Sequence, residues 1–217
     1  MITHNFDGTN SILNTFISEI RDRNIQKDSL RFRKNLERVG EILSYEMSKS
    51  LSYKSLSVTT PLGKKNVHIP NEELVICSVL RAGLPLHQGV LNYFDRAENA
   101  FISAFRKHLD NKPEFEVIVN YFAAPSLDGK VLVLTDPMLA TGKTLENVYK
   151  VIQTHGTPKS IHIVSLIGSQ AGVDYIDQVF GKNTQLWIAA IDDALDKNGY
   201  IIPGIGDAGD LAFGQKL

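Results

Sequence analysis

The sequence is poor in cysteine and lacks long hydrophobic runs. Cys77 is the only cysteine among 217 residues, so no disulfide can form within the chain, which fits a reducing compartment. No apolar stretch approaches the roughly 20 residues that a membrane-spanning helix needs. The first residues also lack the basic start and apolar centre of a secretory signal. We therefore expect a cytoplasmic protein with no membrane partner.

An excess of charge of either sign is also missing. The chain has 23 Lys and Arg against 24 Asp and Glu, a formal net charge of -1, which argues against a dedicated nucleic-acid binder. Hydrophobic residues make up 43% of the chain, enough for a sizeable core. The length suits one domain or at most two small ones, and we expect residues 1–217 to form one.

The first third of the chain contains two recognisable patterns. Residues 1–27 have scattered apolar positions and predict an irregular segment. Apolar residues three or four positions apart then predict a helix that begins near Asp28. Alternating residues on both sides of a turn at 61–65 predict a β-hairpin arm at about 55–70.

From residue 73 onward, apolar runs alternate with amphipathic segments. Such alternation implies right-handed crossovers and a mainly parallel sheet. The expected class is therefore α/β, with a mainly parallel central sheet flanked by helices. The expected strands are 74–80, 100–105, 116–122, 131–134, 161–167 and 186–191, and the expected helices end near 91 and span about 144–155 and 172–180.

The first candidate site follows the apolar run that ends at residue 134. Asp136 should stand at the carboxyl end of a central strand, where open α/β sheets bind ligands. The loop at 140–144 is small and leads into a helix, so its backbone N–H groups and the helix N-terminus form an anion site. Gly142 allows a close approach of the backbone to a phosphate, and Thr141 and Thr144 supply hydroxyl donors.

A nucleotide-triphosphate P-loop is an alternative interpretation of Gly142-Lys143-Thr144. A P-loop requires a glycine five positions before Gly142, and that position is Pro137. An ordinary strand–turn–helix without a ligand is the second alternative. The acid followed at this spacing by Thr-Gly-Lys-Thr favours a phosphate site over both.

The second candidate site is the stretch 199–210, in which five of twelve residues are glycine or proline. A solvent-exposed loop with turn formers is one interpretation. Tyr200, Ile201, Ile202 and Ile205 are apolar, however, which a solvent loop would not favour. Backbone groups of a glycine-rich loop can instead read the edges of a small planar heterocycle, and buried polar groups of this kind discriminate strongly between ligands.

The two stretches together resemble the uracil phosphoribosyltransferases, a branch of the type I phosphoribosyltransferase family. The resemblance runs from about residue 20 to the end. It is carried mainly by Asp136-Pro137-Met138-Leu139-Ala140-Thr141-Gly142 and by the stretch from Gly199 to Asp210, with shorter matches at Arg31-Phe32-Arg33, Tyr45-Glu46, Leu80-Arg81-Ala82-Gly83-Leu84 and Phe213-Gly214. It implies the type I fold with a C-terminal uracil-binding hood at about 192–217. It also implies transfer of a phosphoribosyl group from 5-phospho-α-D-ribose 1-diphosphate to uracil, giving UMP and diphosphate.

The resemblance also implies a role for individual residues. Asp136, Arg106 and Asp207 are the expected catalytic residues, and Arg106 would belong to a loop that covers the diphosphate. The residues expected at the phosphoribosyl diphosphate are Arg81, Arg106, Asp136, Pro137, Met138, Leu139, Ala140, Thr141, Gly142, Lys143, Thr144 and Asp207. Those expected at uracil are Ile201, Gly206, Asp207 and Ala208. Mg²⁺ is the expected cofactor, held mainly by substrate and water, so no protein ligand set is assigned to it.

Two segments depart from the family pattern. Lys143 stands where glycine is common, and it can either contact a phosphate or point to solvent. Lys107-His108 follows Arg106, where the family usually has Asn and Glu.

The family further implies a homodimer or homotetramer, with GTP as an effector in some members, and the hairpin arm and first helix suit pairing with another subunit. The competing hypothesis is a regulator of pyrimidine metabolism on the same fold that binds RNA or nucleotides with little catalysis. It would need a basic face, and only scattered clusters such as Arg31-Phe32-Arg33-Lys34 are present.

Overall fold

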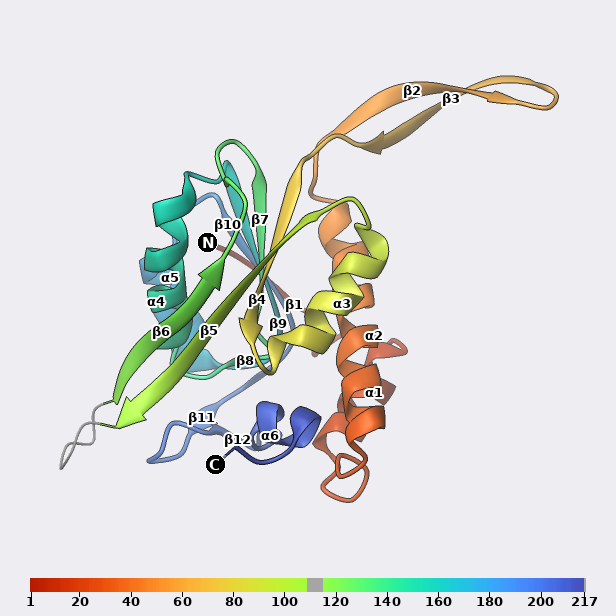
Figure 1. Ribbon diagram of the computed structural model, residues 1–217. Coiled ribbons are helices and arrows are strands. Elements are labelled where there is room, and N and C mark those ends of the chain that lie inside the picture. Colours follow the sequence, from red (N-terminus) through yellow and green to blue (C-terminus); the bar gives the residue numbers. More distant parts are fainter. Residues whose placement is uncertain (109–114, 217) are drawn as a thin grey trace.

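The computed structural model describes the backbone of residues 1–108 and 115–216 and the side chains of 1–103 and 121–216. Its centre is a sheet in the order β1-β10-β9-β7-β4-β5-β6, with β8 paired to β9 (Figure 1). The strands are β1 (Ile2–Asn5), β4 (Leu74–Leu80), β5 (Glu98–His108), β6 (Phe115–Ala123), β7 (Val131–Thr135), β8 (Met138–Leu139), β9 (Ser160–Ser169) and β10 (Thr184–Asp192). All the pairs are parallel except β5 with β6, which confirms the predicted fold class.

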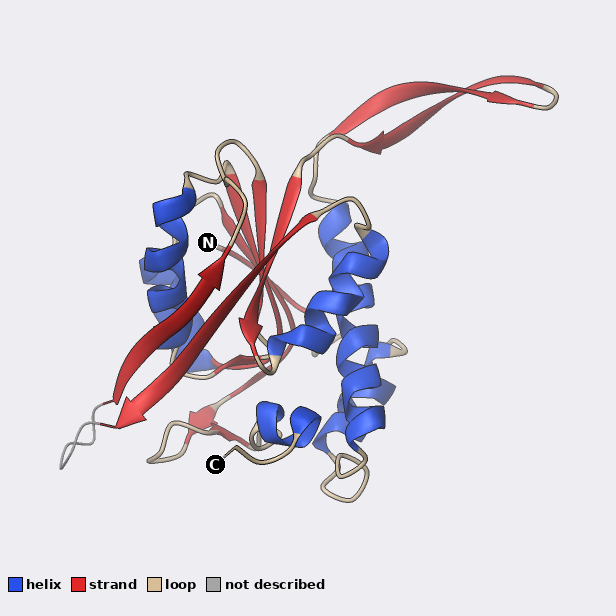
Figure 2. Ribbon diagram, viewed as in Figure 1, coloured by secondary structure: helices blue, strands red, loops and turns tan. Residues whose placement is uncertain are grey.

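Helices cover both faces of the sheet (Figure 2). One layer contains α1 (Leu13–Arg21), α2 (Ser29–Ser48) and α3 (Gly83–Tyr93), and the other contains α4 (Lys143–Ile152), the 3₁₀ turn η1 (Gln153–His155) and α5 (Gln170–Val179). The predicted start of α2 is confirmed, because the carboxylate of Asp28 caps the helix and accepts from the backbone N–H of Arg31 at 3.1 Å.

The strand β7 shows why the predicted strands are continuous apolar runs. Val131 and Val133 pack into the core cluster under α1 to α3, whereas Leu132 and Leu134 pack into the cluster under α4 and α5. A strand between two helical layers needs apolar residues at every position, and each buried Val or Leu contributes about 1.5–3 kcal/mol relative to an exposed one.

The prediction of an irregular segment at 1–27 is wrong. Residues 2–5 form β1, which pairs in parallel with β10 from Ile2↔Gln185 to Asn5↔Ile188, and α1 follows. The ring of His4 stacks on Trp187 at a centroid distance of 3.8 Å. The partner strand β10 lies far from β1 in the sequence, with Ile2 opposite Gln185, so no local pattern predicts this strand.

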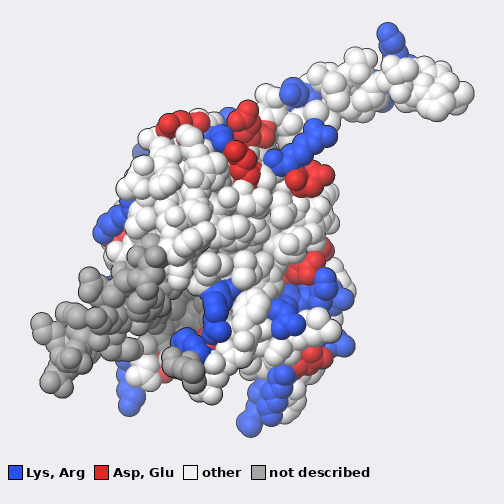
Figure 3. All heavy atoms as spheres, in the orientation of Figure 1, with Lys and Arg blue, Asp and Glu red and all other residues white. Residues whose placement is uncertain are grey.

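Two extensions leave the body. The strands β2 (Tyr53–Thr60) and β3 (Gly63–Pro70) pair antiparallel as a hairpin arm that projects from the molecule (Figures 1 and 3). The C-terminal hood contains β11 (Ala194–Leu195), β12 (Ile201–Ile202) and α6 (Ala208–Phe213), and it lies across the carboxyl ends of the central strands (Figure 1). None of the helices in the described residues is long and apolar enough to cross a membrane.

Candidate active site

Three segments meet at the carboxyl edge of the sheet. The strands β4 and β7 are neighbours in register, with Ser78 opposite Thr135, so the residues that follow them, Arg81 and Asp136, leave the sheet at the same edge. The hood follows β10 and covers this edge from the outside (Figure 1). This is the position at which open α/β sheets bind ligands.

The backbone around Asp136 is fixed by the neighbouring strand β9. The N–H of Asp136 donates to the carbonyl of Val164 at 3.2 Å, and its own carbonyl accepts from the hydroxyl of Ser165 at 2.7 Å. The carboxylate Oδ1 accepts from the backbone N–H of Met138 at 3.2 Å. These contacts orient the half-buried acid at the edge of the sheet without the help of a ligand.

Gly142 is required by both its conformation and its surroundings. Its φ is 77°, and a Cβ at this position would lie 2.8 Å from the Tyr175 ring and 2.9 Å from Cγ2 of Ile176. Any other residue would therefore be strained and would also displace α5. The glycine brings the N-terminus of α4 close to the loop, with its first backbone N–H groups at the surface of the site.

Thr141 carries the clearest sign of a missing partner. Its Oγ1 is buried, and among the described residues it has no hydrogen-bond partner. A buried hydroxyl left unpaired costs about 1–3 kcal/mol, and an oxygen-rich ligand at the loop would remove that cost. Beside it, Lys143 is exposed and Thr144 is half-buried.

The floor of the loop is held by α5. The hydroxyl of Ser169 donates to the carbonyl of Ala140 at 2.6 Å and accepts from the N–H of Gly172 at 2.9 Å. A Cβ at Gly172 would lie 2.2 Å from the carbonyl of Ala140. Pro137, Leu139 and Ala140 are buried against this floor, so they shape the loop, and the half-buried Met138 lies in β8.

Arg81 connects the sheet edge to the hood. Its peptide bond with Leu80 is cis. Its Nη2 donates to Oδ1 of Asp210 at 3.1 Å and to the carbonyl of Gly214 at 3.2 Å. The side chain is 42% exposed, so a ligand in the site can reach it.

The hood is anchored by an ion pair that the sequence did not reveal. Arg21 of α1 binds Asp192 with two hydrogen bonds of 2.7 and 2.9 Å, and its Nη1 also donates to the carbonyl of Gly204 at 3.2 Å. The N–H of Gly204 donates back to Asp192 at 2.9 Å. Because the two side chains are 171 positions apart, no motif could have identified the pair.

The glycine-rich stretch ends at the short helix α6. Asp207 caps α6, and its Oδ1 accepts from the N–H of Asp210 at 3.0 Å while its Oδ2 pairs with Nζ of Lys216 at 2.9 Å. Burial acts to raise the pKa of Asp207, but Lys216 and the backbone N–H groups of Asp210 and Gly209 outweigh it and hold that pKa below its usual range.

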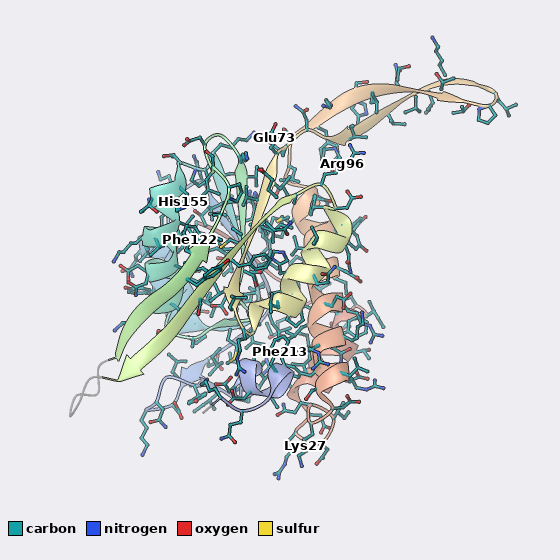
Figure 4. The ribbon with its side chains drawn as sticks, viewed as in Figure 1. Lys27, Glu73, Arg96, Phe122, His155 and Phe213 are labelled. Atoms are coloured by element: carbon teal, nitrogen blue, oxygen red, sulfur yellow. The ribbon has the colours of Figure 1, made fainter. Side chains whose placement is uncertain are left out.

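The backbone before α6 is open to a ligand. Gly206 has φ 89°, and a Cβ there would meet only Leu211, at 4.0 Å. Ala208 and Ile201 are buried, at 2% and 4% exposure, and they fix the two ends of this turn. Phe213, the last residue of α6, lies beside α2 (Figure 4), with the Arg33 guanidinium 5.9 Å from its ring centre.

Arg106 is placed by its backbone alone. It lies in β5 opposite Val117, and its side chain, like those of Lys107 and His108, lies outside the described residues. The structure therefore brings Asp136 to Thr144, Arg81 and the turn at 206–208 together, and it does not place the arginine side chain. Among the described residues, no group of three or more His, Cys, Asp or Glu could hold a metal ion.

Comparisons with known proteins point to one family. A family model described as uracil phosphoribosyltransferase matches residues 9–215. Proteins named uracil phosphoribosyltransferase are 53% identical in Porphyromonas gingivalis, over 95% of both chains, and 36% identical in Methanothermobacter thermautotrophicus, over 95% of this chain and 93% of the relative. A solved structure of an Aquifex aeolicus protein is 31% identical, with a TM-score of 0.85 over 97% of this chain and 98% of the other.

Proposed function

The chain belongs to the uracil phosphoribosyltransferase family, and we propose how its residues carry out the reaction of that family. The enzyme transfers the phosphoribosyl group of 5-phospho-α-D-ribose 1-diphosphate to uracil, and the products are UMP and diphosphate. This is a reaction of pyrimidine salvage. The observation that supports the site assignment best is the unpaired, buried hydroxyl of Thr141 in the turn between β7 and α4.

The loop from Asp136 to Thr144 binds the phosphoribosyl end of the substrate. Backbone N–H groups at the start of α4, together with the hydroxyls of Thr141 and Thr144, receive the 5-phosphate. The carboxylate of Asp136 receives the ribose hydroxyls. Lys143, at the exposed first position of α4, adds positive charge beside the phosphate. Pro137 to Ala140 form the floor that keeps these groups in place.

The hood binds uracil. The turn at Gly206-Asp207-Ala208 and the backbone of Ile201 present N–H and carbonyl groups to the edge of the base. Gly206 leaves room for it, since its missing side chain faces open space. Backbone groups that lose their partner when a different base binds give strong discrimination, which accounts for a preference for uracil.

The chemical step depends on positioning and on charge. Diphosphate leaves while positive charge builds on the sugar, so the site needs groups that bind departing phosphate oxygens and hold the ring nitrogen of uracil against the sugar carbon. Guanidinium groups bind phosphate oxygens in pairs, and Arg81 and Arg106 are assigned this role. Asp207 is assigned contact with both substrates and assistance in the loss of the proton from uracil.

Mg²⁺ is proposed as the cofactor. Mg²⁺ usually keeps several waters and binds one or two carboxylates together with substrate phosphates, and Asp136 and Asp207 are the two site carboxylates that fit such a sparse set. The ion, when bound, neutralises charge on the departing diphosphate. Most of its ligands would come from substrate and water in this proposal.

A homodimer or homotetramer is proposed as the working assembly, in the cytoplasm, with GTP as a candidate effector. The arm from Tyr53 to Pro70 carries Lys54, Lys64 and Lys65 and no acidic residue (Figure 3), and Leu62 at its tip is 99% exposed. Tyr53 and Leu56 of the same arm are exposed as well, and a group of exposed apolar side chains favours pairing with a second copy. Size-exclusion chromatography with light scattering on Leu62→Ser tests this, because a lower mass than the wild type is expected.

A base-selectivity assay tests the proposed function. Purified protein with Mg²⁺ and phosphoribosyl diphosphate should release diphosphate with uracil and not with adenine, guanine or orotate. Release with another base, or none with any, would overturn the assignment. Salt-dependent RNA binding without turnover would instead favour the regulator hypothesis.

A further inference from the structure

Asp210 joins the two halves of the active site, and neither the family match nor the sequence motifs assign it a role. Its Oδ1 accepts from Nη2 of Arg81 at 3.1 Å and from the backbone N–H of Lys216 at 3.4 Å. Its own backbone N–H donates to the carboxylate of Asp207 at 3.0 Å. One residue thus contacts the arginine assigned to the diphosphate and the aspartate assigned to the base.

These contacts fix the orientation of the Arg81 guanidinium and leave some of its donors available to a ligand. Among the described residues its bonds to Asp210 and Gly214 are made by Nη2 alone, so Nη1 and Nε are free to bind diphosphate oxygens. A guanidinium held on one side presents its remaining donors in a fixed direction. The bond from Nη2 of Arg81 to the carbonyl of Gly214 holds the residues that follow α6 beside the site. In this position Nζ of Lys216 pairs with Oδ2 of Asp207 at 2.9 Å.

Stability alone does not explain this arrangement. The side chains of Arg81 and Asp210 are 42% and 29% exposed, and ion pairs with this exposure contribute little to folding. Two positive and two negative side chains, Arg81, Lys216, Asp207 and Asp210, form a connected group in which the charges cancel. A diphosphate that binds Arg81 adds negative charge to this group. Because Arg81 pairs with Asp210, which lies in α6, the added charge acts directly on that helix.

We propose that Asp210 is a positioning residue that couples the diphosphate site to the uracil site through Arg81 and α6. The inference rests on the proposed function, in which Arg81 binds diphosphate and residues 206–208 bind uracil. Diphosphate bound to Arg81 fixes the Arg81–Asp210 contact, and Asp210 in turn holds the start of α6 in the position that receives the base. Binding at the two sites is then mutually favourable, since coupling between two ligands is reciprocal.

Calorimetry of the dead-end complex tests the coupling. Uracil is titrated into full-length protein with Mg²⁺, once without and once with saturating inorganic diphosphate, so that no reaction occurs. In the wild type, diphosphate should tighten uracil binding by about fivefold or more. In Asp210→Asn, which keeps the shape and loses the charge, the factor should fall below about twofold, and Asp210→Glu should recover part of it.

Controls separate coupling from a structural role. A structural defect would weaken uracil binding equally with and without diphosphate, whereas lost coupling removes the difference between the two titrations. Glu46→Gln removes a surface ion pair with Lys49 on α2, far from the site, and should leave the factor at the wild-type value. An unchanged factor in Asp210→Asn, or no coupling in a wild type that binds both ligands, overturns the proposal.

Arg81→Ala distinguishes failure of the inference from failure of the proposed function. It should weaken diphosphate binding and abolish the coupling together. If the wild type binds neither diphosphate nor uracil, or if Arg81→Ala leaves diphosphate affinity unchanged, the site assignment itself is wrong. If Arg81→Ala weakens diphosphate and Asp210→Asn retains full coupling, only the role of Asp210 is rejected.

Discussion

The two halves of the active site are built by different means. The loop from Asp136 to Thr144 is part of the sheet, with its backbone bonded to β9 and its floor packed on α5. The hood packs Ile201, Ile205, Ala208 and Ala212 into the core cluster under α1 to α3. It is also tied to the body by two arginine side chains from distant segments, Arg21 on one side and Arg81 on the other. The phosphate half is therefore preorganised by backbone bonds to the sheet, whereas the base half is held by apolar packing and by a few long-range polar contacts that substitution can remove singly.

The largest expected effect is on the phosphate half. Asp136→Asn keeps the size of the side chain and loses the charge that is assigned to the ribose hydroxyls. We expect turnover to fall by about 100-fold, as for misplaced reacting groups, with an unchanged circular dichroism spectrum and unfolding midpoint. Steady-state kinetics with uracil measures this effect, and turnover close to the wild-type rate would remove Asp136 from the catalytic residues.

The next largest effect is expected at the ion pair that joins the hood to the body. Arg21→Ala leaves Asp192, which is 8% exposed, without its cation. Removing one partner of a buried pair costs about 3–5 kcal/mol, and because Arg21 is 25% exposed we expect about 2 kcal/mol, measured by urea unfolding. The KM for uracil should rise more than the KM for the phosphoribosyl substrate. Arg31→Ala, which removes the exposed pair with Glu19, is the matched control and should change neither value much.

A third substitution should move stability and binding in opposite directions. Thr141→Val removes the unpaired buried hydroxyl, so the free energy of unfolding should stay constant or rise by up to about 1 kcal/mol. The KM for phosphoribosyl diphosphate should rise by about tenfold, the value of one hydrogen bond to a charged group. A loss of stability would mean that the hydroxyl is paired within the protein. Thr154→Val, at an exposed hydroxyl that bonds Val151, should leave the KM unchanged.

The difference between local patterns and contacts of distant segments also explains what the sequence could predict. The apolar run before Asp136, the Thr-Gly spacing and the glycine-rich stretch are local patterns, and they identified the fold class and the family. Arg21 with Asp192, Arg81 with Asp210, and β1 beside β10 are contacts between distant segments, and none has a local pattern. Asp210 and Lys216 lie inside or next to recognised motifs. Their contacts with Arg81 and Asp207 can be identified only from the folded position of the C-terminal residues beside the sheet.

The smallest expected effect is a shift in pH dependence at the hood. The pKa of Asp207 is held below its usual range by Lys216 and backbone N–H groups, against the opposing effect of burial. A carboxylate with a lowered folded pKa stabilises the structure above its unfolded pKa and loses that contribution as pH falls through the folded pKa. Uracil binding should also weaken on the acid side, because protonation of Asp207 weakens its contacts with Lys216 and with the N–H of Asp210, which hold the turn assigned to the base. Lys216→Ala removes one cause of the lowered pKa of Asp207, so the acid limb of the binding curve, where uracil affinity falls, should move to higher pH. Lys150→Ala removes an ion pair with Glu146 on α4 and should leave the acid limb in place.

Calorimetric titration of uracil across the acid range measures the shift. An acid limb that stays in place in Lys216→Ala would show that the backbone N–H groups alone set the charge of Asp207, and the hood would then share the preorganised character of the phosphate loop.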